Sequence, residues 1–300
     1  MAFNPRTFKT RTLTAAVFVV VMLAGLLWNQ WSFFILFSVI HFGCWIEYQK
    51  LIGLIDKDYQ QITPFHRYGV MLAGWCIMLY LTNNSYIILG MYLHELGWWT
   101  SLTFVFILPI NELLFTKHIR LKNIGYSALG LLYISLSWGL MIDMRSSEAI
   151  INIHTHDIIY VIAANQFPLV IIISIWVNDT MAYIIGSLVG KTPLSEISPK
   201  KTWEGTIGGI ILCIGVMGFL FPLIFLPIID FAIAIIITPI AIISAVAGTF
   251  GDLLESRLKR MAGVKDSGSL MPGHGGSLDR FDSLLLATPF VWLYIQLFIK

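Results

Sequence analysis

The residues best suited to chemistry lie toward the C-terminal end, in the 32-residue segment Gly251–Asp282. This segment holds five acidic residues, five basic residues and six glycines, and apolar stretches flank it on both sides. Ordinary connections between helices are about 2–8 residues long, and much longer ones are usually functional or disordered. Because the charges balance and apolar residues recur among them, we interpret the segment as folded and functional.

The second half of this segment, PGHGGSLDRFD, suits a site for a metal-bound polyphosphate. Glycines on both sides of His274 give a backbone that can approach a ligand closely. Asp279 and Asp282 stand on either side of Arg280, directly before the last apolar stretch. Carboxylates are ligands for Mg²⁺, and arginine or lysine side chains neutralise phosphate oxygens.

The first half predicts a helical extension from Asp252 to about Met261. Four polar residues there follow the i, i+3, i+4, i+7 spacing of one helix face: Asp252, Glu255, Ser256 and Lys259. A solvated face held by salt bridges explains these four residues as well as a site does, so both interpretations stay open.

A second polar segment, Gly190–Gly205, also differs from an ordinary connection. Its candidate ligand-binding residues are Ser198, Lys200, Lys201, Thr202 and Glu204. Two cations beside hydroxyl groups in a turn at the membrane surface suit phosphate binding. A basic anchor on the cytoplasmic side would explain the two lysines, but it would not explain the clustered hydroxyls or the glutamate.

Three acidic residues stand inside or at the end of apolar stretches. Asp179 interrupts the run LVIIISIWVNDTMAYIIG. A charge at the centre of a bilayer costs about 2.5–3.5 kcal/mol on insertion scales, so Asp179 is a functional candidate. Glu112 and Glu47 are weaker candidates, since Glu47 can simply reach the interface from its helix end.

The composition requires a membrane setting for these segments. Hydrophobic residues make up 57% of the 300 residues, charged residues only 12%, and the mean hydropathy is +0.79. Soluble domains carry about 25% charged residues, so a water-soluble fold is excluded. We predict one all-α polytopic membrane domain spanning residues 1–300, with no strand alternation and about nine transmembrane helices. The predicted spans are 12–28, 31–48, 68–83, 98–115, 124–142, 166–190, 205–226, 231–250 and 283–299, with residues 84–97 left as a longer third span or a re-entrant piece.

The basic residues predict the orientation of these helices. With the N-terminus inside, 17 of the 19 lysines and arginines fall on the cytoplasmic side, including both polar segments. We therefore expect a polar cytoplasmic catalytic face, formed by segments of about 190–205 and 251–282.

The polar segments resemble the signature of the phosphatidate cytidylyltransferases, or CDP-diacylglycerol synthases. SRLKRMAGVKDSGSLMPGHGGSLDRFD matches it from Ser256 through Lys265-Asp266 and His274 to Asp279-Arg280-Phe281-Asp282. NDTMAYIIGSLVGKTPLSEISPKKTWEG, residues 178–205, is similar to a second block of that family. The strong resemblance covers about residues 178–282.

This resemblance implies a nucleotidyltransferase that converts CTP and phosphatidate to CDP-diacylglycerol and pyrophosphate in phospholipid biosynthesis. It implies Mg²⁺ on Asp252 and Asp279, with a second cation left open. Lys200, Lys201, Lys259 and Arg280 would hold phosphates, Asp179 would orient or complete the site, and His274 would contact phosphate or transfer a proton. Further substrate-binding candidates are Ser198, Thr202, Glu204, Lys265, Asp266 and Asp282.

The chemistry is consistent with these residue types. The phosphate of phosphatidate is already anionic at neutral pH, so the reaction needs charge neutralisation and in-line positioning rather than an activated nucleophile. We expect a bacterial inner-membrane protein with its active site facing the cytoplasm, partnered by the bilayer and not by nucleic acid; a homodimer stays open.

Two other functions are compatible with parts of the sequence. A CTP-dependent lipid kinase shares a similar polar block, but it would transfer the γ-phosphate. An ion-coupled transporter could use Asp179 and Glu112 as a relay, but it would normally show paired halves with broken helices. It would also leave the segment Gly251–Asp282 unexplained.

Overall fold

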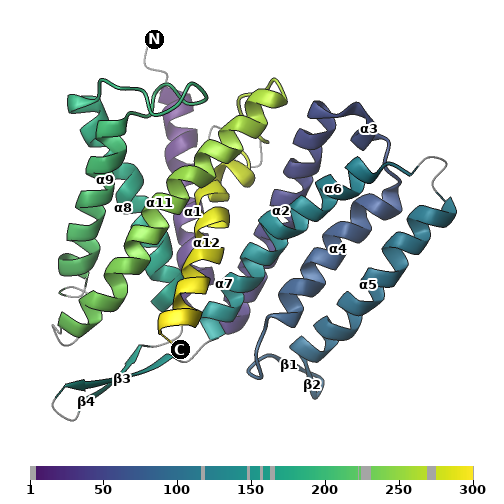
Figure 1. Ribbon diagram of the computed structural model, residues 1–300, viewed down its shortest axis with the longest axis horizontal. Helices are drawn as coiled ribbons and strands as arrows, with labels where there is room; N and C mark the ends of the chain where they lie inside the picture. The colour runs from purple at the N-terminus through teal and green to yellow at the C-terminus, as the bar shows by residue number, and fades with distance from the viewer. Residues whose placement is uncertain are drawn as a thin grey trace. The chain divides into compact units, whose positions relative to one another are not determined.

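The computed structural model is dominated by long helices (Figure 1). It describes residues 5–115, 119–146, 149–155, 158–162, 166–221, 223, 231–268 and 275–299. The helices are α1 (Pro5–Leu27), α2 (Gln30–Ile55), α3 (Lys57–Gln60), α4 (Pro64–Tyr80), α5 (Leu93–Phe115), α6 (Leu121–Gly130), α7 (Ser137–Ser146), α8 (Gln166–Val189), α9 (Trp203–Gly215), α11 (Phe231–Met261) and α12 (Leu278–Phe298). Two π-helical stretches, Leu131–Leu136 and Val216–Leu220, join α6 to α7 and extend α9.

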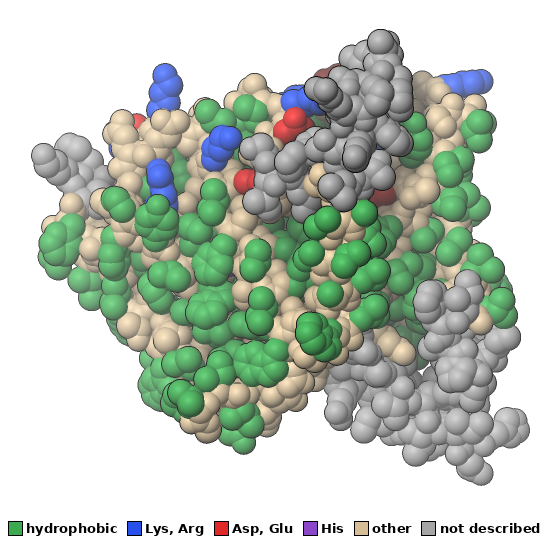
Figure 2. Space-filling view, turned by 180° about the vertical axis from the view of Figure 1, so that it is seen from behind, with side chains coloured by type: hydrophobic (Ala, Val, Ile, Leu, Met, Phe, Trp, Pro, Cys, Tyr) green, Lys and Arg blue, Asp and Glu red, His purple; other side chains and the backbone are tan. Residues whose placement is uncertain are grey.

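Seven of the described helices are long and apolar enough to cross a membrane. Each of the nine predicted spans overlaps a described helix. The two outside the seven lie on α4, which is 17 residues long, and on α1, where Ala16–Leu27 forms a shorter apolar segment. The all-α polytopic membrane fold is therefore confirmed, while the count of nine spans stays a prediction. Hydrophobic side chains predominate on the visible surface in Figure 2, as expected for helices that face lipid.

The prediction that the chain contains no strands was wrong. β1 (Ile87–Ile88) pairs with β2 (Met91–Tyr92), and β3 (Ala149–Thr155) pairs with β4 (Ile158–Ile162), both antiparallel. Leu89 and Gly90 both have positive φ, 51° and 80°, as the two central residues of a type I′ hairpin turn require. This turn accounts for part of the apolar stretch 84–97, which the sequence left undecided.

Local sequence explains where several helices begin. Asn29 and Ser32 form a reciprocal capping box at the start of α2, with Asn29 accepting from the Ser32 N–H at 2.8 Å. The Thr63 side chain caps α4, and Pro64 occupies its first position. These short polar connections turn the chain sharply between apolar helices.

The chain divides into two compact units. One comprises Met1–Ser146 with Leu258–Phe281, and the other comprises Ser147–Arg257 with Asp282–Lys300. The first is called here the α2 unit and the second the α8 unit. α11 and α12 each contribute to both.

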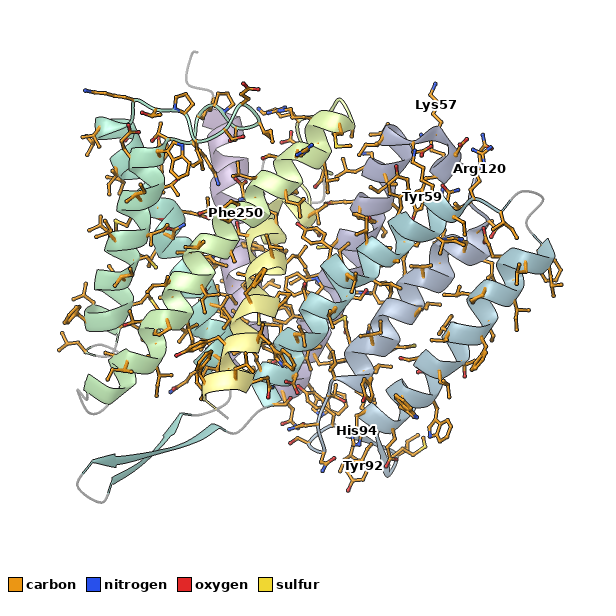
Figure 3. The ribbon with its side chains drawn as sticks, in the orientation of Figure 1. Lys57, Tyr59, Tyr92, His94, Arg120 and Phe250 are labelled. Atoms are coloured by element: carbon orange, nitrogen blue, oxygen red, sulfur yellow. The ribbon has the colours of Figure 1, made fainter. Side chains whose placement is uncertain are left out.

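The core of the α2 unit forms around α2, α4 and the helices α6–α7. Trp45, Trp138 and Phe37 are fully buried, and the Trp45 Nε1 donates to Ser135 Oγ at 2.9 Å. In Figure 3, Lys57, Tyr59 and Arg120 lie at one end of this unit, whereas Tyr92 and His94 lie at the opposite end. The first end is polar: Arg120 pairs with Asp58, and Lys122 with Asp56 at 2.6 Å.

In the α8 unit, α8 packs along α9 (Figure 1). The chain between them, residues 190–202, carries the first of the two predicted catalytic segments. The second segment begins on α11, which continues as a single helix to Met261. The predicted helical extension from Asp252 to Met261 is thereby confirmed.

Candidate active site

The segment between α8 and α9 forms a closed loop with defined backbone bonds. Pro193 and Thr202 face each other in an antiparallel bridge, the Leu194 N–H donates to the Lys201 carbonyl at 2.7 Å, and the Trp203 N–H donates to the Thr192 carbonyl at 2.9 Å. These bonds fix the backbone on either side of the turn. The loop therefore presents its lysines from a braced position.

Two of the predicted substrate-binding residues brace this loop. Thr202 Oγ1 accepts the Gly205 N–H at 3.1 Å and so caps α9. The Glu204 carboxylate accepts from the Thr192 hydroxyl at 2.9 Å and from the Lys191 and Thr192 N–H groups at 3.2 Å. In the structure these side chains support the loop, and their direct contact with substrate stays a prediction.

The two lysines of the loop differ in their surroundings. Lys201 forms an ion pair with Asp252 on α11, and both side chains are about one-third exposed or less. Lys200 is exposed and has no ion-pair partner among the residues that the structure describes. Ser198 contributes its carbonyl, which accepts the Lys201 N–H at 3.0 Å and closes the turn. One lysine is thus engaged and the other is available to an incoming anion.

Asp252 belongs to a group of three carboxylates in the α8 unit. Asp282, buried near the start of α12, lies within electrostatic reach of Asp252. Asp179 on α8 is exposed and lies within electrostatic reach of both Lys201 and Asp252. The backbones approach closely here, since a Cβ at Gly251 would lie 2.5 Å from the Asp282 carbonyl oxygen.

This group carries more negative than positive charge. Adjacent carboxylates repel each other unless a proton or a cation lies between them. Lys201 is the one lysine or arginine that the structure pairs with the group within the described part of the chain. A proton shared between two of the carboxylates, or a cation brought in with a substrate, would relieve this excess of negative charge.

A second group forms in the α2 unit around Asp279. Lys259 Nζ lies 2.7 Å from Asp279 Oδ1, and both side chains are largely buried. Asp279 Oδ2 accepts the N–H groups of Ser267 and Gly276 at 2.9 and 2.8 Å. Asp279 thus ties the end of α11 to the start of α12.

Glu47 on α2, a weaker candidate from the sequence, contacts the polar segment Gly251–Asp282 directly. Its carboxylate is 7% exposed and accepts from Ser267 Oγ, Ser277 N and Leu278 N at 2.8–2.9 Å. A Cβ at Gly268 or Gly276 would collide with this carboxylate, so both positions admit only glycine without a shift. The cost of a glutamate inside an apolar helix was the signal in the sequence that could have singled it out.

The remaining predicted site residues differ in how exposed they are. Lys265, Asp266 and Arg280 are exposed. Glu255 is fully buried, although the sequence placed it on the same face as the more accessible Asp252. His274 lies outside the described residues.

The fit to Mg²⁺ differs between the aspartates. Within the described residues no group of three or more His, Cys, Asp or Glu side chains has ligand geometry for a metal. Asp252 with Asp282 supplies the carboxylate oxygens that Mg²⁺ prefers, usually one or two together with substrate phosphates. Both oxygens of Asp279 are already engaged by donors, so Asp279 would have to exchange Lys259 for a metal.

Known proteins resemble this chain along nearly its whole length. Residues 9–298 match the cytidylyltransferase family. A phosphatidate cytidylyltransferase of Staphylococcus saprophyticus is 31% identical over 94% of this chain and 96% of its own length. One of Bacillus subtilis is 37% identical over 62% of this chain and 65% of its own length. Phosphatidate cytidylyltransferase 4, chloroplastic, of Arabidopsis thaliana is 43% identical over 41% of this chain and 30% of its own length.

These matches confirm the resemblance that the polar segments carry. They extend it over the N-terminal helices, where the sequence offered mainly hydropathy. The chain belongs to the cytidylyltransferase family.

Proposed function

We propose that this protein transfers CMP from CTP to phosphatidate, giving CDP-diacylglycerol and pyrophosphate, through the lysines and aspartates of its two polar segments. The observation that carries the activity is the similarity to a phosphatidate cytidylyltransferase over 94% of the chain. The two lysine–aspartate pairs, Lys201–Asp252 and Lys259–Asp279, support the assignment of the residues.

Each pair is suited to binding a metal-bound triphosphate. A triphosphate brings about four negative charges, and the transition state spreads charge over the oxygens of the transferred phosphoryl group. Lys201 and Lys259 are held in position by their aspartates and can turn to phosphate oxygens when those aspartates are engaged elsewhere. Lys200, exposed on the same braced loop, adds a third cation.

Mg²⁺, when bound, would neutralise the triphosphate and orient its α-phosphorus for in-line attack. Asp252 is the metal ligand that the surroundings support best, because Asp282 lies beside it. Asp279 is proposed as the second ligand, with Lys259 released to phosphate. Asp252 and Asp279 belong to different units, and their joint role is a proposal that rests on the family resemblance.

The attacking oxygen needs no strong base. A phosphate monoester is anionic at neutral pH, so the site has to hold two anions together and in line rather than remove a proton. Asp179, accessible on α8 and near Lys201, is placed to orient the bound cations rather than to bind phosphate itself. We assign the site to the cytoplasmic side of a bacterial inner membrane, where CTP is available.

Two labelled nucleotides test the reaction. Purified protein in detergent micelles or nanodiscs is given phosphatidate, diacylglycerol as a lipid with a free hydroxyl, Mg²⁺ and CTP labelled in either the α- or the γ-phosphate. We expect the α-label in the lipid product and the γ-label in pyrophosphate. Transfer of the γ-label to lipid would instead identify a CTP-dependent lipid kinase, and no labelled lipid from either nucleotide would reject both enzymes.

A further inference from the structure

A pocket of about 430 Å³ lies in the α2 unit, apart from the residues assigned above. One face of α2 forms its first wall through residues at helical spacing: Ile46, Gln49, Lys50, Gly53 and Leu54. Gln60 of α3 and the start of α4, with Arg67, Tyr68 and Met71, complete it. Glu47, on the same helix, does not line this pocket, because its carboxylate accepts a hydrogen bond from Ser277 of the polar segment Gly251–Asp282. The volume is within the range of small-molecule sites.

The polar part of the pocket carries two unpaired positive charges. Within the described part of the chain, neither Lys50 nor Arg67 forms an ion pair. The Arg67 Nη2 donates to the Gln60 carbonyl at 3.3 Å, whereas its Nε is buried and has no hydrogen-bond partner among the described residues. An arginine without a carboxylate partner can pair with an anionic group, and the exposed Lys50 ammonium belongs to the same pocket.

The neighbouring acids cannot supply that acceptor. Asp56 pairs with Lys122 and Asp58 with Arg120. Glu112 bonds to His66 Nδ1 at 3.0 Å. The positive charge of the pocket is therefore not neutralised from within the unit.

The apolar part of the pocket is open to lipid. Ile46, Tyr68 and Leu54 are 60%, 59% and 43% exposed, and they lie on helices that belong to the membrane-facing set or to the short span α4. A water-soluble anion would gain no binding free energy from contact with this apolar wall. A molecule with an anionic head and acyl chains satisfies both parts at once.

We propose that this pocket binds an anionic glycerophospholipid of the surrounding membrane, with its phosphate on Arg67 and Lys50 and its acyl chains against Ile46, Leu54 and Tyr68. Gln49 and Gln60 border the phosphate position. Gln60 is held by its own bond to the Gly53 carbonyl at 2.8 Å, and Gln49 by its bond to the Arg67 carbonyl at 2.9 Å. These bonds within the protein hold the walls of the pocket in place without a bound lipid. This lipid is bound and not consumed.

Native mass spectrometry of the full chain tests the proposal, with phosphatidylglycerol as the probe. This lipid is anionic but is neither a substrate nor a product of the proposed reaction, so the outcome is independent of the proposed function. We expect saturable binding, at least about tenfold tighter than that of phosphatidylcholine. The double variant Lys50→Gln/Arg67→Gln should weaken phosphatidylglycerol binding by about tenfold or more.

Lys57→Gln is the matched control, because Lys57 is an exposed cation on the adjacent α3 and does not line the pocket. It should leave phosphatidylglycerol binding unchanged. If the double variant folds poorly, Lys50→Gln alone, at an exposed position, carries the test with an expected loss of about fivefold.

Three results would overturn the proposal. One is equal binding of phosphatidylglycerol by the wild type and the pocket variants. Another is equal weakening by Lys57→Gln, which would mean diffuse surface charge. The third is full displacement of phosphatidylglycerol by millimolar inorganic phosphate, which would mean a site for a free anion.

Discussion

Replacing Glu47 by glutamine tests whether a residue outside both polar segments positions the catalytic aspartate. Glu47 accepts from Ser267 Oγ and the Ser277 and Leu278 N–H groups, and these residues flank the backbone that holds Asp279. Glutamine keeps the shape of the side chain. It exchanges one acceptor oxygen for an NH₂ group that then faces a donor.

The expected cost follows from these contacts. Oε1 receives one bond, from Ser277 N, and Oε2 receives two, so the least costly glutamine orientation loses one bond. A hydrogen bond to a charged group contributes about 1.5–3 kcal/mol. If the order of the segment limits turnover, this corresponds to a decrease of roughly ten- to a hundredfold in kcat. Alanine would leave all three buried donors unpaired, at about 1–3 kcal/mol each, and is expected to disorder the segment.

The assay combines kinetics with amide hydrogen exchange. Glu47→Gln should lower kcat more than it raises KM for CTP, and exchange should accelerate at Ser277 and Leu278. Glu112→Gln is the matched control, since Glu112 is an equally buried acid of the same unit that bonds to His66 instead. Unchanged turnover and unchanged protection at Ser277 in Glu47→Gln would refute the positioning role.

Three further predictions concern the site and its sidedness. Asp252→Asn and Asp279→Asn should each lose nearly all activity and shift the Mg²⁺ requirement of any remainder. Near wild-type turnover with unchanged Mg²⁺ dependence would exclude that aspartate as a ligand. Lys200→Gln/Lys201→Gln should abolish or severely reduce turnover in a protein that still inserts and folds, whereas normal activity would leave the pair as a topological anchor. Single cysteines placed next to Lys200 and Lys265 should react with a membrane-impermeant reagent only from the cytoplasmic side, and labelling from outside in intact cells would contradict the predicted orientation.

The sequence by itself determined the class of the protein and singled out the segments where its chemistry is expected. Charged residues are costly in lipid, so Asp179, Lys201 and Asp252 stand out in so apolar a chain as candidates for function. Helical periodicity is a local property, and it correctly extended α11 to Met261. The hairpins were missed because short isoleucine-rich strands have no periodicity that separates them from short pieces of apolar helix.

Only the tertiary structure decided which of the polar residues lie together. Two ion pairs, Lys201–Asp252 and Lys259–Asp279, cannot be predicted from sequence spacing. Which helix faces meet depends on packing across the whole unit. The same holds for Glu47, which lies 220 residues from Ser267 in the chain and 2.8 Å from it in space. A buried carboxylate is stable only where donors converge on it, and long-range folding alone brings the serine and backbone donors of the catalytic segment to α2.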